Sequence, residues 1–200
     1  MYARGVYHVA GHGSDDRSLF IDDRDRHFFL SHLNETAALL GVRVITFMLM
    51  TNHHHLLLDT PDSRIAAALH RLHGGYARHH NIRHGRNAHL FRAHPLARRI
   101  EDNDDLKWTD RYIARNPVEA GLVPDPFDWF WSSVHAHAGL AEAPIPLYDA
   151  PLRGAYENHP NWRDHYHAYV SRRQDRDSFT REGSARRAAP HARAMASIGD

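Results

Sequence analysis

Cysteine is absent from this 200-residue chain, which excludes disulfide bonds and cysteine-based metal sites. The chain also lacks any run of eighteen apolar residues, so no segment is expected to span a membrane. Its first residues, Met-Tyr-Ala-Arg-Gly-Val, include no long apolar stretch of the kind found in secretory signals. Together these absences predict a cytoplasmic protein without membrane association.

Lysine is almost absent too, since Lys107 is the only lysine beside 24 arginines. The net charge of +1 hides an uneven distribution. Residues 63–100 contain eight arginines and no acidic residue, whereas residues 1–62 carry a net charge of −3 and residues 101–200 carry −4. A concentrated basic segment is expected of a protein that binds phosphate groups, so the charge favours nucleic acid as a partner. The alternative is a solvated helix face in an arginine-rich protein.

The apolar pattern predicts seven elements in the order strand, helix, strand, strand, helix, strand, helix. The strands are expected at residues 5–10, 42–50, 53–58 and within 88–100, and the helices at residues 22–40, from 63 onward and at 101–115. The last helix is expected to end before Pro117. The fold class that follows is α+β: a ferredoxin-like split β-α-β sandwich, with an antiparallel sheet and helices on one face.

Composition also predicts the domain organisation. Residues 1–140 hold the sandwich, and residues 141–170 are expected to form a helical appendage with an aromatic helix at 155–170. Residues 171–200 are rich in Arg, Ser and Ala and poor in apolar groups, so a disordered tail is expected there.

A pair of histidines is the first candidate for chemistry. His53 and His55 lie two apart on a predicted strand, so both point to the same face and can share one divalent ion. His54 points the other way. Asp59 has the same parity, but four residues at about 3.3 Å each place it roughly 13 Å from His55, which excludes it as a ligand. In a chain with 20 histidines, surface or core histidines are an equally good interpretation.

The second candidate is a tyrosine followed by an asparagine. Tyr112 and Asn116 are four residues apart, so they lie on the same side of the predicted helix. Tyrosine offers a hydroxyl nucleophile, and asparagine offers a carbonyl oxygen that suits hard cations. Spacing alone favours the alternative, in which Tyr112 packs in the core and Asn116 caps the helix.

Four segments occur in an order typical of one known family: Tyr7-His8-Val9, residues 49–58 (LMTNHHHLLL), residues 111–123 (RYIARNPVEAGLV) and Trp131-Ser132-Ser133. Over roughly residues 5–140 the chain resembles the REP-associated tyrosine transposases, relatives of the single-tyrosine HUH transposases of small insertion sequences. The second and third segments together are specific to this group. The resemblance identifies residues 1–140 as an HUH transposase-like catalytic domain.

The resemblance implies a role for each motif residue. His53 and His55 correspond to the metal-binding pair, and Asn116 corresponds to the third ligand. Tyr112 corresponds to the nucleophile that forms a 5′-phosphotyrosine with cleaved single-stranded DNA and leaves a 3′-OH. The implied cofactor is Mg²⁺ or Mn²⁺. The implied partner is single-stranded DNA near imperfect palindromic, REP-like hairpins, which predicts a bacterial, nucleoid-associated protein.

The chain departs from the family pattern at His54, at His12 and in residues 90–95, and one tyrosine is a rival nucleophile. The middle HUH position is normally bulky and apolar, so a buried His54 needs a hydrogen-bond partner, or the metal site is registered on His54 instead. His12 stands where the family commonly has an arginine. Tyr76 lies in the basic helix near His79 and His80, although its place on the apolar stripe of that helix favours core packing.

Three functional hypotheses follow. The first is a metal-dependent single-strand DNA endonuclease and strand transferase, in which arginines bind hairpin phosphates: Arg64, Arg71, Arg78, Arg83 and Arg86. The second is a non-catalytic hairpin-binding protein derived from such an enzyme. The third is a histidine-site metallohydrolase that does not act on DNA. The sequence is compatible with a monomer and with a homodimer.

Overall fold

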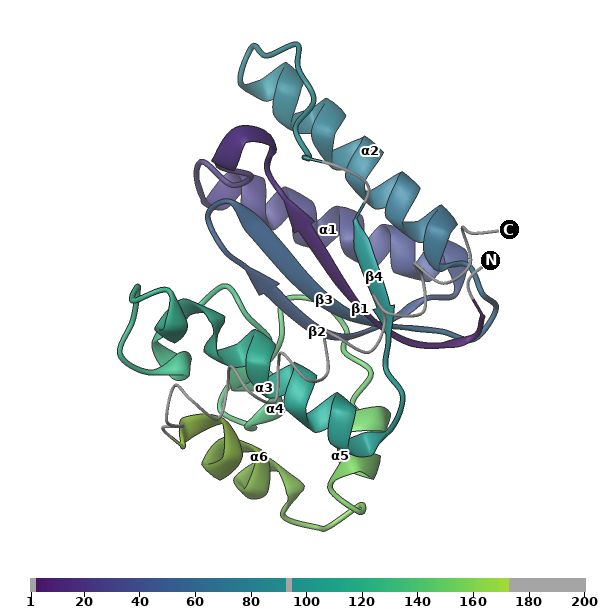
Figure 1. Ribbon diagram of the computed structural model, residues 1–200, viewed down its shortest axis with the longest axis vertical. Helices are drawn as coiled ribbons and strands as arrows, with labels where there is room; N and C mark the ends of the chain where they lie inside the picture. The colour runs from purple at the N-terminus through teal and green to yellow at the C-terminus, as the bar shows by residue number, and fades with distance from the viewer. Residues whose placement is uncertain (1–2, 93–94, 173–200) are drawn as a thin grey trace, which may run out of the picture. The chain divides into compact units, whose positions relative to one another are not determined.

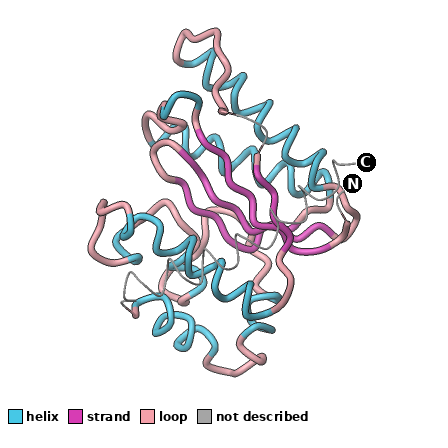
Figure 2. The backbone as a smooth tube through the Cα atoms, in the orientation of Figure 1, coloured by secondary structure: helices cyan, strands magenta, loops and turns pink. Residues whose placement is uncertain are grey.

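The structure is a computed structural model that describes residues 3–92 and 95–172 (Figures 1 and 2). Its strands are β1 (Gly5–His12), β2 (Arg43–Leu49), β3 (His53–Thr60) and β4 (Leu96–Arg99). They form one antiparallel sheet in the order β2-β3-β1-β4. The helices are α1 (Asp23–Leu40), α2 (Ile65–Arg83), α3 (Asn103–Glu119), α4 (Val134–His137), α5 (Ala150–Ala155) and α6 (Trp162–Ser171), with 3-10 turns η1 (Ser14–Asp16) and η2 (Pro126–Asp128).

The first seven of the longer elements, β1-α1-β2-β3-α2-β4-α3, follow the order that the sequence predicts, and the α+β class with an antiparallel sheet is confirmed. α1 matches its prediction closely. The side chain of Asp22 accepts hydrogen bonds from the backbone N–H groups of Arg24 and Asp25, which caps the first turn. Gly41 ends the helix in the left-handed conformation, with φ of 65°.

Helices cover both faces of the sheet (Figure 1). Alternate strand residues point to opposite faces, so each strand contributes to two cores. On one face, Val9 and Leu56 pack with Phe29 in the core beneath α1 and α2. On the other, Leu57 packs with Ile113 in the core formed with α3 and the C-terminal helices. The sequence predicts helices on one face of the sheet, and α1 and α2 do share a face. α3 to α6 form a further layer on the opposite face, which the sequence did not predict.

Element boundaries differ from the predictions, most clearly in α3, β4 and α6. α3 runs through Pro117 to Glu119 instead of ending before the proline. Proline removes only one N–H donor, and the Ala120 N–H still bonds to the Asn116 carbonyl at 3.0 Å, so the helix continues. β4 is shorter than expected, and the aromatic helix α6 begins at Trp162.

Residues Met1–Val170 form one compact unit, to which the sites described below belong. The predicted tail at 171–200 lies almost entirely outside the described residues. Within the described residues, no helix combines the length and the apolar character needed to cross a membrane.

Candidate active site

Two histidines and an asparagine converge where β3 faces α3. His53 and His55 point to the sheet face that α3 covers, as their two-residue spacing predicts. The side chain of Asn116 meets both: its Oδ1 is 2.9 Å from His53 Nε2, and its Nδ2 is 3.3 Å from His55 Nε2. The structure thus brings together the three residues that the sequence singles out as metal ligands.

Hydrogen bonds determine which ring nitrogen of each histidine faces this site. His53 Nδ1 lies 2.8 Å from Asn52 Oδ1, so it carries the hydrogen and donates it to that oxygen. The lone pair of His53 is then on Nε2, toward Asn116. His55 Nδ1 lies 3.0 Å from His8 Nε2, which leaves His55 Nε2 as the acceptor facing Asn116. Both imidazoles therefore direct an Nε2 lone pair toward the same point.

This set of donor atoms fits a divalent cation. His53 Nε2 and Asn116 Oδ1 both carry lone pairs, yet they approach to 2.9 Å, and a positive charge between them would remove their repulsion. Adjacent ligand atoms around Mg²⁺ lie roughly 3 Å apart, because metal–ligand distances of about 2.1 Å meet at right angles. The distance between His53 Nε2 and Asn116 Oδ1 satisfies this requirement, and His55 Nε2 lies at the other end of the same amide.

Burial keeps the two histidines uncharged. Desolvation lowers the pKa of His53, and the nearby Asn116 oxygen, which favours the protonated ring, only partly opposes this effect. His55 is 3% exposed. Desolvation, and to a lesser extent the neighbouring His8, hold its pKa well below the ordinary value. At neutral pH both rings are therefore neutral and keep the lone pairs that a metal requires.

Tyr112 lies one helical turn before Asn116 and is half-buried beside the histidines. Its ring centroid is 5.6 Å from that of His55 and 6.1 Å from that of His8. Trp108, one further turn back, stacks on Tyr112 with ring centroids 5.7 Å apart and planes inclined by only 6°. The stacked indole limits the orientations that the Tyr112 ring can adopt.

His54, the departure from the family pattern, points to the opposite face of the sheet. Its Nε2 lies 2.9 Å from His73 Nε2, and its ring packs 4.9 Å from that of Phe29. Gly11 on the neighbouring strand makes room for the ring, since a Cβ there would lie 2.4 Å from His54 Nε2. His73 therefore supplies the partner that a buried histidine needs, and the flanking histidines keep their register toward α3.

The rival residues of the sequence analysis lie elsewhere. Tyr76 is fully buried, and its hydroxyl donates a hydrogen bond to the Leu19 carbonyl at 2.5 Å. Desolvation raises the pKa of Tyr76, which further disfavours it as a nucleophile. Asp59 pairs with Arg43 at the far end of β3.

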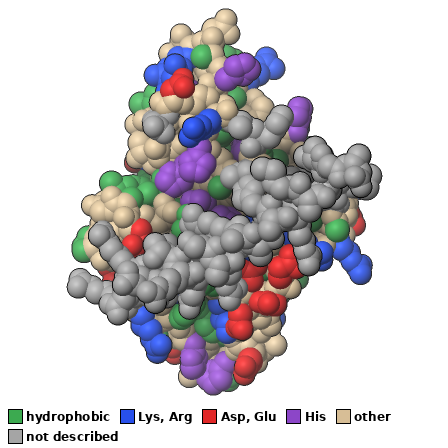
Figure 3. All heavy atoms as spheres, in the orientation of Figure 1, with side chains coloured by type: hydrophobic (Ala, Val, Ile, Leu, Met, Phe, Trp, Pro, Cys, Tyr) green, Lys and Arg blue, Asp and Glu red, His purple; other side chains and the backbone are tan. Residues whose placement is uncertain are grey.

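The arginines expected to contact DNA belong to α2 and its flanks. Arg64, Arg71, Arg78 and Arg86 are exposed. Arg83 differs, because its guanidinium forms ion pairs with Asp22 and Asp25 at the start of α1. On the face drawn in Figure 3, the coloured Arg and Lys side chains are spread out, and histidines are visible near the middle as well as toward the top and the bottom.

Three residues that orient the side chains of this site were not predicted from the sequence. For two of them, the spacing in the sequence indicates the position. His8 faces the same side of β1 as the metal pair of β3, which its strand parity indicates. Trp108 precedes Tyr112 by four residues, the spacing of neighbours on one helix face. Asn52 lies in a turn, and nothing in the local pattern indicates that its side chain orients His53.

Comparison with known proteins adds to this geometry. Residues 3–116 match the family described as "Transposase IS200 like". The fold is similar to that of a REP-associated tyrosine transposase solved bound to a REP hairpin, with a TM-score of 0.61 and 16% identity over 75% of this chain and 93% of that chain. A protein of Deinococcus radiodurans R1, provisionally named a transposase, gives a TM-score of 0.42 and 18% identity over 56% of this chain and 91% of that chain. No curated protein matches the sequence.

Proposed function

The chain belongs to the IS200-like transposase family, and we propose that it cleaves and rejoins single-stranded DNA through a covalent bond to Tyr112. The observation that carries this proposal is the approach of α3 to β3. Asn116 lies 2.9 Å from His53 and 3.3 Å from His55, and the same helix presents Tyr112 one turn earlier. A candidate nucleophile thus lies beside a set of metal-binding groups.

In the proposed reaction, Tyr112 attacks the phosphorus of one phosphodiester. A bond forms between its Oη and phosphorus as the phenolic proton is lost. The bond between phosphorus and O3′ breaks, and the departing oxygen gains a proton. The products are a 5′-phosphotyrosine and a free 3′-OH. Attack of a 3′-OH on the phosphotyrosine reverses the step and joins strands, so the phosphodiester energy is conserved.

His53, His55 and Asn116 would hold Mg²⁺ or Mn²⁺, which would withdraw negative charge from a phosphate oxygen when bound. The protein's own part is orientation. Asn52 and His8 hold the two imidazole rings by hydrogen bonds of 2.8 and 3.0 Å. The stacked indole one turn before the tyrosine restricts the phenol, and such restriction favours in-line attack.

The proposed substrate is single-stranded DNA that flanks a REP-like hairpin. The structurally similar transposase is bound to a REP hairpin, which supports this choice. The exposed arginines of α2 and its flanks would bind the hairpin phosphates: Arg64, Arg71, Arg78 and Arg86. Arg83 would join them only by leaving its ion pairs with α1.

A covalent-adduct assay tests the proposal. The protein is incubated with a labelled hairpin that carries single-stranded flanks, in the presence of Mn²⁺, and the products are separated on a denaturing gel. We expect a labelled protein band that requires the metal and disappears in Tyr112→Phe. Tyr76→Phe is the matched control, because it removes only a buried hydroxyl that bonds to Leu19, and it should keep the adduct.

The other outcomes point to different functions. Tight hairpin binding without an adduct in the unmodified protein would indicate a hairpin-binding protein that does not cleave. An adduct that survives Tyr112→Phe but is lost in Tyr76→Phe would show that Tyr112 is the wrong tyrosine. Absence of both binding and adduct would contradict DNA as the substrate.

A further inference from the structure

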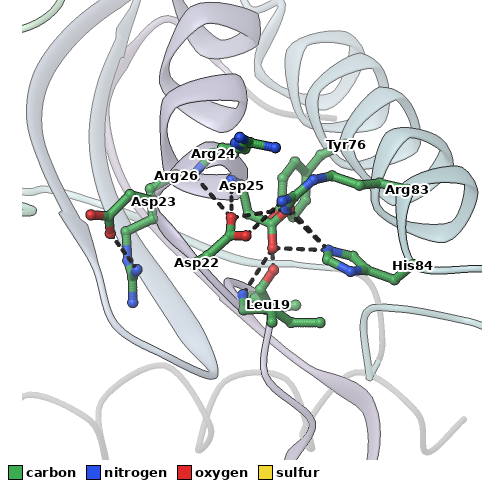
Figure 4. Close-up of polar contacts among 10 residues, drawn as sticks. Leu19, Asp22, Asp23, Arg24, Asp25, Arg26, Tyr76, Arg83 and His84 are labelled. Carbon is green, nitrogen blue, oxygen red and sulfur yellow. Dashed lines mark hydrogen bonds and ion pairs between the residues drawn. The ribbon is translucent and has the colours of Figure 1, made fainter.

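A second group of potential metal ligands lies between α1 and α2, on the sheet face opposite Tyr112. Figure 4 shows two of its members, Asp25 and His84. Asp25 lies in the first turn of α1, His80 in the last turn of α2, and His84 at the C-cap of α2. Each offers one ligand atom, and these atoms lie within 4.8 Å of one another. Among the described residues, no other three His, Asp or Glu side chains converge in this way.

We propose that Asp25, His80 and His84 bind a transition-metal ion of the zinc class, with water as the fourth ligand. Imidazole and carboxylate groups are established zinc ligands. His80 and His84 are four residues apart, so they project from the same side of the helix end. Ligand atoms of a tetrahedral zinc site lie roughly 3.4 Å apart, so small side-chain rotations suffice to close the site.

His80 is the observation that points most directly to a ligand. Its side chain is 0% exposed, and neither ring nitrogen has a hydrogen-bond partner among the described residues. The ring lies between Tyr76 and His84, with centroid distances of 6.1 and 4.5 Å. A buried imidazole without partners is unfavourable, and a metal ion would satisfy its lone pair. Burial also lowers the pKa of His80 to about 4, so the ring is neutral at pH 7.

Asp25 supplies the negative charge. Burial alone would raise its pKa, but the backbone N–H of Ile21, His84 and Arg83 together hold the pKa below its ordinary value. The carboxylate is therefore ionised although it is 0% exposed. His84 Nε2 lies 3.1 Å from both carboxylate oxygens, so a metal ion would replace the hydrogen that His84 shares with Asp25.

Arg83 is the competing cation, and its main partner is another carboxylate. It makes two contacts with Asp22, of 2.8 and 2.5 Å, and one with Asp25 Oδ1, of 2.5 Å (Figure 4). One guanidinium therefore faces two carboxylates. The three groups together have a net charge of about −1, which attracts a metal cation. Arg83 Nη1 also lies 3.3 Å from His84 Nε2, so the guanidinium would turn away from His84 when a metal ion binds. Oδ2 of Asp25 lies 3.1 Å from His84 Nε2 and accepts from the Ile21 N–H at 2.9 Å.

The proposed ion would join the start of α1 to the end of α2. The two helices form the layer that covers one face of the sheet, so the ion would stabilise that layer. This proposal is independent of the chemistry assigned to Tyr112. Its two-histidine, one-carboxylate ligand set also differs from that of the candidate active site, which contains an amide.

Metal titration of the purified full-length protein tests the proposal. Because the candidate active site can also bind Zn²⁺, all variants carry His53→Gln as a common background. We expect one Zn²⁺ per chain by calorimetry, a higher melting temperature with Zn²⁺, and the visible absorption of four-coordinate Co²⁺ when Co²⁺ replaces Zn²⁺. His84→Gln should weaken Zn²⁺ binding about 100-fold or more, since even partners of ligands contribute 10- to 100-fold.

The controls separate loss of the site from loss of the fold. His70→Gln alters an exposed histidine on the same helix and should leave Zn²⁺ binding unchanged. His80→Leu replaces the unpartnered imidazole with an apolar group, so the metal-free melting temperature should not fall while Zn²⁺ binding is lost. Equal Zn²⁺ affinity in His84→Gln and His70→Gln, or no Zn²⁺ bound in the His53→Gln background, would show that the cluster is an ion-pair network only.

Discussion

The two imidazole rings of the candidate active site are each oriented by a hydrogen bond to a neighbour that the sequence did not predict as a functional residue. Asn52 accepts the hydrogen of His53 Nδ1, and His8 accepts that of His55 Nδ1. These bonds determine the tautomers, so the two Nε2 lone pairs face Asn116 before any ion binds. The site is therefore organised in advance, which reduces the rearrangement that metal binding requires.

Trp108 is expected to act as a positioning residue for Tyr112. Its indole stacks on the phenol with planes inclined by 6°. In Trp108→Ala the phenol gains orientations that are unsuited to attack, so adduct formation should slow by about 10- to 100-fold. Trp108→Phe keeps a stacking ring and should retain most of the rate. The measurements are the single-turnover adduct rate and the hairpin dissociation constant; equal losses in both variants, or weaker binding, would contradict a positioning role.

Gly11 is expected to be required by the ring of His54. A Cβ at Gly11 would lie 2.4 Å from His54 Nε2, and this ring is fixed by its contact with His73. Gly11→Ala should therefore lower the free energy of unfolding by about 1–3 kcal/mol, measured by urea denaturation. Combining it with His54→Ala removes the clash, so the double variant should lose less than the sum of the single variants. Additive losses would contradict the assigned contact.

Strand parity predicted which residues of β3 face which side, because side-chain direction in a strand depends only on the local backbone. It did not predict what each side chain meets. His73 lies on α2, and its approach to His54 depends on how that helix packs on the sheet. Contacts between distant segments of this kind follow from the tertiary fold and have no local pattern in the sequence.

At the scale of elements, the apolar run of β2 indicates that both faces of the sheet are covered by helices. The predicted fold class, with helices on one face, did not include this. Both faces of this strand are buried, with Phe47 in one core and Met48 in the other. A strand buried on both faces needs a helical layer on each side. Helices on one face would have left half of these side chains exposed, and α3 to α6 cover them.

α3 is expected to depend on Asp105 for its attachment to β4. Asp105 is 4% exposed, forms two bonds with Arg98 of 2.7 and 3.0 Å, and accepts from the Glu101 N–H. Asp105→Asn should lower the free energy of unfolding by about 2 kcal/mol at pH 7, because hydrogen bonds to a charged group are lost. Asp104→Asn, on the same helix and 79% exposed, is the matched control and should have little effect.

The effect of Asp105→Asn should depend on pH. Burial would raise the pKa of Asp105, but Arg98, the Glu101 N–H and Thr109 more than compensate and hold the pKa below its ordinary value. The ionised form therefore stabilises the folded protein above the unfolded-state pKa near 4, and this contribution is lost as the pH falls through the lower folded-state value. Urea unfolding of both proteins at several pH values should show the difference shrinking in acid; a constant difference would exclude ionisation as the cause.

For the molecule as a whole, a net charge of +1 gives little long-range attraction to DNA, so binding must depend on local charge. Three of the eight arginines of the basic segment lie on α2, and the structure divides the arginines of the segment into exposed ones and paired ones. Arg71 and Arg78 are exposed, whereas Arg83 is paired with Asp22 and Asp25. Sequence could count these charges but could not identify Arg83 and Arg98 as paired, because their carboxylate partners lie at the starts of other helices.

The salt dependence of hairpin binding should distinguish these arginines. Each phosphate contact contributes about 0.7–0.9 to the slope of log affinity against log salt concentration. Arg71→Gln should therefore reduce the slope by about 1. Arg83→Gln should reduce it less, since the guanidinium already faces carboxylates. Arg153→Gln is the control, because this exposed arginine belongs to α5 in the helical layer on the other face of the sheet. If Arg153→Gln lowered the slope as much as Arg71→Gln, the DNA would lie against the other helical layer, and the assignment of α2 as the phosphate-binding helix would be wrong.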